Sequence, residues 1–336
     1  MRVVVVGAGL AGLTAARMLH DVHDVVVVDK GRGVGGRMAT RRIGDATLDH
    51  GAQFFTTHTQ EFASVVEAWE AAGMARPWFR GRVGPSGIDD ADGADDVSDV
   101  ERHTRFRGTD SMSSLAKWLA VGLDVRVSSP VTAVAHESNG NGWVASVGDS
   151  VLRADAVLLT APVPQSLALL EAGGVVLADD DLTALRAISY EPCIAMLAVM
   201  DGPTRLPEPG AVQPGGEPIG WMADNQRKGV STAPAVTIHA TAGFSREHWD
   251  SPDATVIDLL LTAAALGSSP LVGSVQVHRW RFARPVHVHP ARHLAAQGLA
   301  SLLFAGDAFG GAKVEGAVLS GRSAGAALTL LAHEVR

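Results

Sequence analysis

Short, uninterrupted hydrophobic runs mark the start of the chain. Residues 2–6 (RVVVV) and 24–28 (DVVVV) are rich in β-branched side chains, which indicates two strands. Between them, apolar residues recur at helical spacing: Leu10, Leu13, Met18 and Leu19. This pattern predicts a β-α-β unit. Because strands that are apolar on both faces are typical of a parallel sheet covered by helices, the N-terminus predicts the core of a doubly wound sheet.

The middle of the chain has a different pattern. Residues 124–137, 142–148 and 154–162 are expected to be strands, separated by Asn-Gly and Gly-Asp turn signals. They predict a small β-meander followed by a return to the buried sheet. Residues 192–244 are rich in strand patterns and lack the β-α-β alternation, so we expect residues 166–274 to form a second domain inserted into the first.

The C-terminal part returns to an alternating pattern. Residues 274–285 are expected to form a strand, and the segment from Leu302 onward predicts a strand, a glycine-rich turn and a long helix. Small residues along that helix would let it pack very close to another backbone or to a ligand: Gly316, Ala317, Ser320, Gly321, Ala324 and Gly325.

Charge and composition exclude several classes of protein. A net charge of -8 over 336 residues argues against nucleic-acid or anionic-membrane binding, which require a basic surface. The acidic stretch Asp89–Asp99 predicts a solvated loop, since it lacks the glutamate of a calcium loop. No apolar run approaches the ~20 residues that span a bilayer, and no signal peptide is evident, so we expect a cytoplasmic protein. A single cysteine, Cys193, excludes an internal disulfide framework.

Gly7, Gly9 and Gly12 form a G-x-G-x-x-G motif directly between the first predicted strand and helix. In this context the glycines permit a tight turn, a close approach to a pyrophosphate and close helix–strand packing. Asp29, at the end of the next strand, is placed to accept hydrogen bonds from ribose hydroxyls. The sequence therefore predicts one dinucleotide-binding unit.

A second match, at Gly31, Gly33 and Gly36, follows Asp29 instead of preceding a helix, so it does not predict a second dinucleotide site. Arg32 and Arg37 lie beside these glycines, and a guanidinium there would clamp a pyrophosphate. The alternative is a flexible basic loop.

Several of these segments together resemble the FAD-dependent amine-oxidase-like flavoproteins, and among them the bacterial renalase-type oxidases. The resemblance is carried by 7–12 (GAGLAG), 29–30 (DK), 35–37 (GGR), 48–55 (LDHGAQFF) and 304–321 (FAGDAFGGAKVEGAVLSG). It implies an α/β fold with a discontinuous FAD-binding, doubly wound Rossmann-type domain and an inserted, strand-rich substrate domain. We expect the first to comprise 1–75, 100–165 and 275–336, and the second 76–99 and 166–274.

The resemblance further implies noncovalent FAD, since Cys193 is far in sequence from the last motif. Asp29 would contact the adenosine ribose, Arg37 the pyrophosphate, Val131 the adenine, and Asp307 the ribityl or pyrophosphate region. Val314 to Ala317 would present the N-terminus of the last helix to flavin N1, where Lys313 would add positive charge. The full set of implied cofactor-binding residues is Gly7, Ala8, Gly9, Ala11, Gly12, Asp29, Lys30, Gly36, Arg37, Ala52, Gln53, Phe54, Val131, Gly306, Asp307, Val314, Gly316 and Ala317.

The activity implied by the resemblance is oxidation of isomeric (2- or 6-) dihydro-NAD(P) to NAD(P)⁺, by hydride transfer to flavin N5 with O2 giving H2O2. Loss of hydride yields the aromatic pyridinium directly, so orientation replaces acid–base catalysis. Gln53, Trp280 and Trp221 are the candidate catalytic residues. We expect a small-molecule substrate and O2 as partners, and no obligate protein partner.

Two other functions stay open. The first is an amine oxidase, although Tyr190 is the only tyrosine, so an aromatic cage would use Trp221, Trp280 and Phe282. The second is a non-catalytic FAD-binding module. A disulfide reductase is disfavoured because no cysteine pair exists.

Two short motifs are expected to carry no chemistry. The G-x-S-x-G match at 321–325 lies within a helix-period run, which does not suit a hydrolase nucleophile elbow. His287, His289 and His293 are expected in a surface turn, or a polar patch near a dinucleotide phosphate, and no metal site is predicted.

Overall fold

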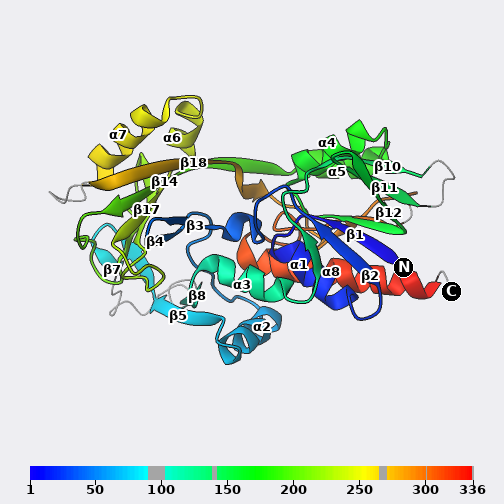
Figure 1. The fold of residues 1–336 in the computed structure, drawn as a ribbon, viewed down its shortest axis with the longest axis horizontal. Helices are drawn as coiled ribbons and strands as arrows, with labels where there is room; N and C mark the ends of the chain where they lie inside the picture. Colours follow the sequence, from blue (N-terminus) through cyan, green and yellow to red (C-terminus); the bar gives the residue numbers. More distant parts are fainter. Residues whose placement is uncertain (90–102, 138–141, 265–270, 300, 335–336) are drawn as a thin grey trace. The chain divides into compact units, whose positions relative to one another are not determined.

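The computed structural model describes residues 1–89, 103–137, 142–264, 271–299 and 301–334, so most of the acidic stretch Asp89–Asp99 lies outside the described residues (Figure 1). By the density of internal contacts the chain divides into two compact units. Unit 1 comprises 1–37, 116–190 and 284–336, and unit 2 comprises 38–115 and 191–283.

The unit boundaries differ from those of the predicted domains. Residues 38–75 belong to unit 2, because the hairpin within them packs Ile43, Ala46 and Leu48 against Leu197 and Ala235. Residues 166–190 belong to unit 1, because they carry two helices that pack into its core rather than strands of the second sheet.

The core of unit 1 is a six-stranded sheet with the order β19-β20-β13-β1-β2-β9. All neighbours are parallel except β19 and β20, and Val4 lies between Val26 and Val157. The buried run of four valines in β1 therefore follows from its central position, as predicted. The elements of the sheet and its helices are β1 (Arg2–Val6), α1 (Leu10–Leu19), β2 (Asp24–Val28), β9 (Asp124–Arg126), β13 (Ala156–Leu159), β19 (Leu294–Ala295), β20 (Leu302–Phe304) and α8 (Lys313–Glu334).

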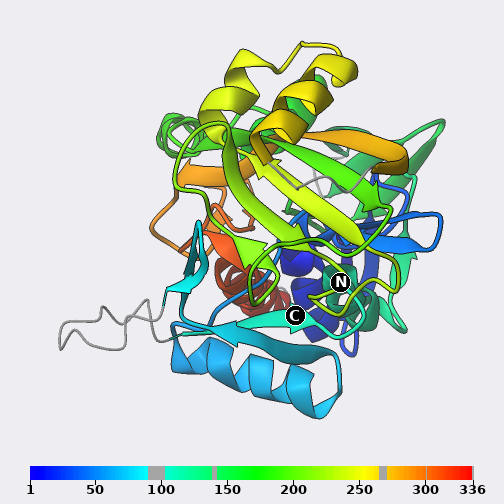
Figure 2. The same ribbon diagram turned by 90° about the vertical axis from the view of Figure 1, so that its left-hand side faces the viewer.

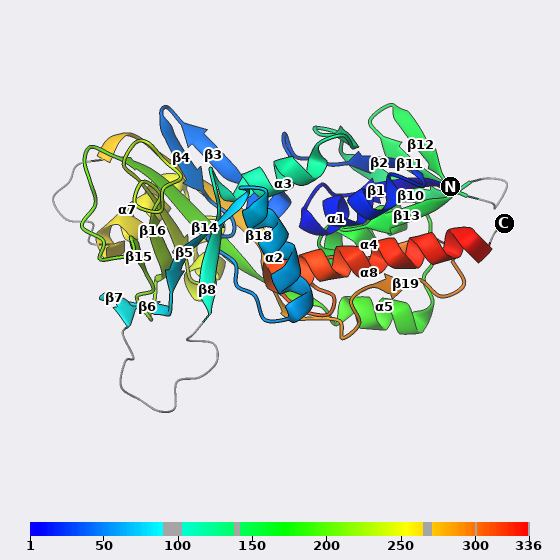
Figure 3. The ribbon, with the colours of Figure 1, turned by 90° about the horizontal axis from the view of Figure 1, so that it is seen from below.

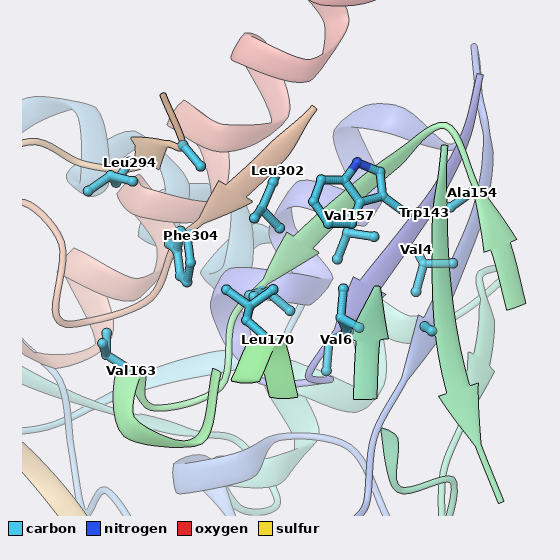
Figure 4. Packing of buried hydrophobic residues seen from close by; sticks show 14 of the residues in the cluster. Val4, Val6, Trp143, Ala154, Val157, Val163, Leu170, Leu294, Leu302 and Phe304 are labelled. Atoms are coloured by element: carbon cyan, nitrogen blue, oxygen red, sulfur yellow. The ribbon is translucent and has the colours of Figure 1, made fainter. Parts of the chain in front are cut away.

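A second layer of unit 1 is an antiparallel sheet of β10 (Val131–His136), β11 (Trp143–Val147) and β12 (Ser150–Ala154), so a meander is present with bounds that differ from the predicted ones. The predicted strand 124–137 divides into β9, which joins the parallel sheet, and β10, and most of β12 precedes the predicted strand 154–162. Helices α4 (Val163–Ala172) and α5 (Asp179–Arg186) follow β13, in a part of the chain that is expected to belong largely to the inserted, strand-rich domain. Leu170 of α4 joins Trp143, Val157 and Phe304 in one hydrophobic core (Figure 4). These helices complete the first core instead of starting a second domain.

Small residues set the spacing between α1 and α8, which lie side by side (Figure 3). A Cβ added at Gly321 would lie 2.2 Å from the carbonyl oxygen of Ala11, and one at Gly325 would lie 3.3 Å from the Met18 side chain. The sequence predicts that these small residues permit close packing either on another backbone or on a ligand. The structure shows close packing on the backbone of α1.

Unit 2 is built on a five-stranded sheet with the order β15-β16-β17-β14-β18. Helices α6 and α7 cover one face of it (Figure 2), where Val256 and Leu260 of α7 join Ile194, Met222 and Ile238 in a core. The elements of this sheet are β14 (Ser189–Met200), β15 (Ala211–Val212), β16 (Ile219–Asp224), β17 (Ala235–Ala240), α6 (Ala242–Glu247), α7 (Asp253–Ala264) and β18 (Leu271–His287).

Residues 38–115 add smaller elements to unit 2. These are β3 (Thr40–Ile43), β4 (Ala46–Asp49), α2 (Gln60–Ala71), β5 (Ala75–Arg80), β6 (Arg82–Gly84), β7 (Gly87–Asp89) and β8 (Thr104–Gly108), with α3 (Met112–Ala120) crossing the boundary between the units. The strands pair as hairpins β3-β4 and β6-β7 and as the antiparallel pair β5-β8. None of the helices that the structure describes is long and apolar enough to cross a bilayer.

Candidate functional site

The first glycine motif adopts the geometry that a phosphate cradle requires. Gly7 follows β1 with φ of +117°, and a Cβ added at Gly12 would lie 2.0 Å from the Gly7 carbonyl oxygen. Gly9 caps α1 without a side-chain hydrogen bond, and a Cβ there would meet nothing within 4 Å. The position of a side chain at Gly9 is therefore open, which suits the close approach of an anionic phosphate to the N-terminus of α1.

The second glycine segment folds back over the first. The Gly35 N–H donates to the Ala8 carbonyl oxygen at 2.8 Å, and a Cβ added at Gly36 would lie 3.6 Å from the Gly9 Cα. Asp29 joins the two segments, since one carboxylate oxygen accepts from Ala8 N at 2.7 Å and the other from Gly31 N at 2.6 Å. A 3-10 turn at Gly36–Met38 and then β3 follow, so the second match opens no α-helix.

Arg37 meets Asp307, a residue 270 positions away, in a bidentate ion pair with N···O distances of 2.7 and 2.6 Å. Both side chains stay partly accessible, at 27% and 12%. The sequence analysis assigns each of these residues to the cofactor separately, and the structure brings them together. Gly306 precedes Asp307 and donates its N–H to the Ser320 hydroxyl of α8 at 2.8 Å.

The remaining predicted cofactor residues of unit 1 lie at ends of elements. Val314, Gly316 and Ala317 form the first turn of α8, after Lys313 with φ of +75°. Val131 begins β10 opposite Val147. Lys30 donates to the Gln165 side chain at 3.0 Å.

In unit 2, Asp49 is the centre of a buried hydrogen-bond network that the sequence analysis missed. Its carboxylate forms an ion pair with Lys228 Nζ at 2.8 Å, and both side chains are 0% exposed. The other carboxylate oxygen accepts from Thr40 Oγ1 at 2.6 Å and from Met112 N at 3.0 Å, while Asp49 N donates to Asn225 Oδ1 at 3.1 Å. Burial lowers the pKa of Lys228, and the Asp49 carboxylate opposes that shift. No local pattern marks these residues; only the rarity of lysine, four in the chain, singles out Lys228.

Gln53 is held by this network. Its Nε2 donates to the carbonyl oxygens of Asp49, at 2.6 Å, and Gly51, at 3.1 Å. The Oε1 atom is buried and has no partner among the described residues. Gln53 thus presents an acceptor whose position is fixed by both bonds of its amide nitrogen.

Trp280 belongs to the same cluster through His50. Its indole Nε1 donates to the His50 carbonyl oxygen at 2.9 Å, and the two rings stack with centroids 5.4 Å apart. His278 lies edge-on to Trp280 at 4.3 Å, and His239 Nε2 lies 3.1 Å from the same carbonyl oxygen. Burial, then His278 and Arg41, lower the pKa of His50 to about 3, and burial lowers that of His239 to about 4. These imidazoles are therefore neutral at neutral pH.

Trp221 is the third predicted catalytic residue and lies in a neighbouring aromatic group. Phe54, which follows Gln53, has its ring 5.2 Å from Trp221, and Trp78 lies 6.3 Å from Trp221. The Trp221 indole Nε1 is buried with no partner among the described residues. Arg105 completes this group, with its guanidinium over the ring of Phe54.

The G-x-S-x-G match and the three histidines near residue 290 are the motifs that are expected to carry no chemistry, and the structure shows their surroundings. Residues 321–325 lie inside α8. His287 and His293 contact Ser189 and Ser323, respectively, and His289 contacts Ala291. Among the residues described, no three histidine, cysteine, aspartate or glutamate side chains are grouped so that they would hold a metal ion.

The only tyrosine and the only cysteine of the sequence both lie in buried surroundings. Tyr190 accepts from Val163 N at 3.1 Å, and burial raises its pKa to about 12, so the only tyrosine packs in unit 1. Burial raises the pKa of Cys193 to about 12 as well, which keeps it a thiol.

Comparison with protein families gives two matches. The model for flavin containing amine oxidoreductase matches residues 85–329, and the model for the NAD(P)-binding Rossmann-like domain matches residues 5–69. Together they extend over most of both units.

Solved structures of similar fold cover nearly the whole chain. Putrescine oxidase bound to putrescine has a TM-score of 0.70 at 15% identity over 98% of this chain and 99% of that one. Cyclohexylamine oxidase from Brevibacterium oxydans IH-35A has a TM-score of 0.69 at 14% identity over 99% of both. A protein from Exiguobacterium sp. 255-15, provisionally assigned as a protoporphyrinogen oxidase, has a TM-score of 0.70 at 13% identity over 98% of both. At these identities the similarity shows a shared fold.

Proposed function

The chain belongs to the family of flavin-containing amine oxidoreductases, and we propose that within it the protein is a renalase-like oxidase of isomeric (2- or 6-) dihydro-NAD(P). Membership of this family with a Rossmann-like dinucleotide-binding domain implies FAD as the cofactor. When bound, the flavin would accept a hydride equivalent from the substrate carbon and pass two electrons to O2.

The residues of unit 1 fit the dinucleotide part of FAD. The open space beside Gly9, at the start of α1, accommodates a pyrophosphate, and Arg37 would neutralise it from the second glycine segment. The remaining lone pairs of Asp29 would accept from the ribose hydroxyls. Asp307 would hold Arg37 in place through its bidentate ion pair.

The choice of substrate rests on two of the three buried side-chain polar atoms of unit 2 that have no partner among the described residues; the third is His50 Nδ1. Gln53 Oε1 is a buried acceptor and Trp221 Nε1 a buried donor, and neither has a partner among the described residues. Phe54 links the two residues, because it follows Gln53 in the chain and its ring contacts that of Trp221. Since buried polar groups are nearly always hydrogen-bonded, a ligand is expected to complete them. One donor and one acceptor beside aromatic rings complement the carboxamide of a dihydronicotinamide, which presents one N–H donor group and one carbonyl acceptor.

The chemistry of this substrate matches the residues present. Loss of hydride leaves an aromatic pyridinium, so no side chain has to remove a proton. His50 and His239 stay neutral, and Gln53 and Trp280 are fixed by hydrogen bonds to the backbone of residues 49–51. These groups orient a ring, which is the contribution the reaction needs.

Amine oxidation is the second candidate, and the aromatic group of Phe54, Trp78 and Trp221 favours it, since such rings would also enclose the carbon chain of an amine. A simple alkylamine does not complement Gln53 Oε1 and Trp221 Nε1 together, because it offers no carbonyl acceptor to Trp221 Nε1.

Anaerobic mixing of the FAD-loaded protein with candidate substrates tests the proposal. We expect 2- or 6-dihydro-NAD(P) to bleach the flavin absorbance and primary amines to leave it unchanged. Bleaching by amines alone would establish the second candidate and reject the first. If neither class bleaches the flavin, both candidates are rejected and the result favours a non-catalytic FAD-binding module.

A further inference from the structure

Arg105, in β8 of unit 2, is a buried cation without an anionic partner among the described residues. We infer that Arg105 is a subsite for a phosphate group of the substrate, which makes the preferred substrate an anionic dinucleotide rather than an amine. This inference rests on the proposed function and extends it to the far end of the substrate molecule.

The guanidinium of Arg105 packs against two aromatic rings that also contact each other. Its central carbon lies 5.4 Å from the centroid of Phe54 and 5.3 Å from that of Phe79, and the residue is 9% exposed. Cation–π contacts with two faces fix the plane of the guanidinium. The arginine is therefore preorganised, which lowers the entropic cost of binding a ligand.

Among the residues that the structure describes, most of the donors of Arg105 have no acceptor. Its hydrogen bond within the described residues is from Nη1 to the His103 carbonyl oxygen, at 3.3 Å. A guanidinium has five N–H donors in a planar fork that matches two phosphate oxygens. Arg107, two residues along the same strand, differs because its Nη1 donates to the carbonyl oxygens of Gly108, at 3.0 Å, and Thr109, at 2.6 Å.

The electrostatic surroundings of Arg105 also favour the binding of an anion. Burial, followed by the nearby Arg82, lowers the pKa of Arg105, so the described surroundings disfavour its charge. The other buried cation of unit 2, Lys228, has the Asp49 carboxylate at 2.8 Å. Because buried charges in proteins are normally paired, a ligand phosphate is the group that would supply the counter-charge at Arg105.

The position of Arg105 connects it with the proposed carboxamide site. Phe54 contacts both the Arg105 guanidinium and the Trp221 ring, and it follows Gln53 in the chain. A dinucleotide carries its phosphates on the ribose attached to the nicotinamide ring, so one substrate presents both groups. A protonated amine would instead meet a like charge at Arg105.

Binding to the FAD-loaded protein tests this inference directly. The probe is ADP-ribose, which has the diphosphate of the substrate but no nicotinamide ring, followed by calorimetry or by perturbation of the flavin spectrum. We expect Arg105→Met to weaken ADP-ribose binding ~10- to 100-fold, as expected for loss of charge-assisted hydrogen bonds. The matched control is Arg76→Met, at an exposed arginine of the neighbouring strand β5, which should bind ADP-ribose like the wild type.

A comparison of substrates with and without phosphate distinguishes phosphate recognition by Arg105 from a structural role of this residue. Arg105→Met should raise KM for isomeric dihydro-NAD by a similar factor, yet leave KM for the corresponding dihydronicotinamide riboside unchanged. Equal losses for both substrates would show a structural role and overturn the inference. If Arg105→Met does not fold, wild-type binding of ADP-ribose should weaken as salt is raised, and binding that is independent of salt would overturn it.

The two proposals fail in different ways. Arg105-dependent binding of ADP-ribose, together with no flavin reduction by any dihydronicotinamide, would reject the proposed function and leave the phosphate subsite standing. Flavin reduction by dihydro-NAD with ADP-ribose binding unaffected by Arg105→Met would do the reverse.

Discussion

The two units obtain their polar sites in different ways. In unit 1 the site that we assign to a phosphate is made largely of backbone, since Gly7 and Gly12 shape the turn into α1, Gly9 caps that helix, and Asp29 accepts from two backbone N–H groups. In unit 2 the site is made of side chains that are far apart in sequence, such as Asp49 and Lys228. A backbone cradle is specified by a short local motif, whereas a side-chain network depends on the whole fold of its unit.

The two units also differ in how far their ion pairs are exposed to solvent. The Arg37–Asp307 pair of unit 1 stays partly accessible, and we assign its arginine to a cofactor phosphate. The Asp49–Lys228 pair is fully enclosed and positions the backbone that holds Gln53. We therefore expect substitutions in unit 1 to change cofactor binding first, and substitutions in unit 2 to change stability first.

The largest expected effect is on the cofactor. Arg37→Ala should yield largely apo protein, because one guanidinium supplies the charge-assisted contacts that we assign to the pyrophosphate. The ratio of flavin to protein absorbance after purification measures this. Arg32→Ala, at the exposed arginine of the same segment, should keep its FAD. Full occupancy in Arg37→Ala would refute the assignment of this arginine to the cofactor.

Breaking the buried pair of unit 2 should have the largest effect on stability. Lys228→Met leaves the Asp49 carboxylate buried without a counter-charge, which costs about 3–5 kcal/mol of unfolding free energy. Denaturant unfolding of the apo and FAD-loaded forms measures the loss. Arg126→Met, which removes the exposed pair with Asp124 (44% and 47% accessible), should cost less than about 1 kcal/mol. Equal effects at the two sites would mean that burial of the Asp49–Lys228 pair is unimportant.

Close backbone packing in unit 1 should be disrupted by a single methyl group. Gly321→Ala places a Cβ 2.2 Å from the Ala11 carbonyl oxygen and should cost about 1–3 kcal/mol by forcing α1 and α8 apart. Gly33→Ala, in the second glycine match, meets no atom within 4 Å and should change stability by less than about 0.5 kcal/mol. Thermal unfolding compares the two, and a larger loss for Gly33→Ala would contradict the packing described here.

Lowering the pH should gradually decrease the stability of the folded protein, because His50 and His239 of unit 2 are buried in their neutral form. The pKa values of His50, about 3, and His239, about 4, lie below the value of 6.5 for an unperturbed histidine. Below pH 6.5 the unfolded chain therefore binds protons that the folded protein does not, and stability falls as pH falls. The slope is up to about 1.4 kcal/mol per pH unit for each histidine.

Urea unfolding between pH 7 and pH 5 measures this slope. His239→Asn should reduce it, and the same measurement on His287→Gln, at an exposed histidine, controls for the loss of an imidazole. A stability that is constant over this range would show that the buried histidines do not resist protonation.

The sequence predicts the parts of the fold that local patterns specify. The valine runs of β1 and β2, the meander and the helix after the last glycine-rich turn all follow from residues that are neighbours in the chain. The helices α4 and α5 are missed because residues 166–274 are treated as one strand-rich domain, although the three aspartates that open α5 are typical of a helix N-terminus. The Rossmann-type fold and the family are confirmed.

The candidate site is less accessible to sequence analysis because its pairs are distant. Arg37 and Asp307 are 270 residues apart, and Asp49 and Lys228 are 179 apart, so only folding brings them together. Arg105 is a further example, since the residues that bury its guanidinium, Phe54 and Phe79, are distant from it in the sequence. The assignments of Gln53, Trp221 and Trp280 to substrate stay predictions.

The central claim, that the protein oxidises a dihydronicotinamide, is tested most directly by analysing the products of one anaerobic turnover. FAD-loaded protein is mixed with one equivalent of 2- or 6-dihydro-NAD(P), and the reduced flavin and the released NAD(P)⁺ are quantified together. We predict one NAD(P)⁺ for each flavin reduced. Unreacted dihydro-NAD(P) with oxidised flavin, in a preparation whose flavin a primary amine reduces with release of aldehyde and ammonia on hydrolysis, would contradict the claim.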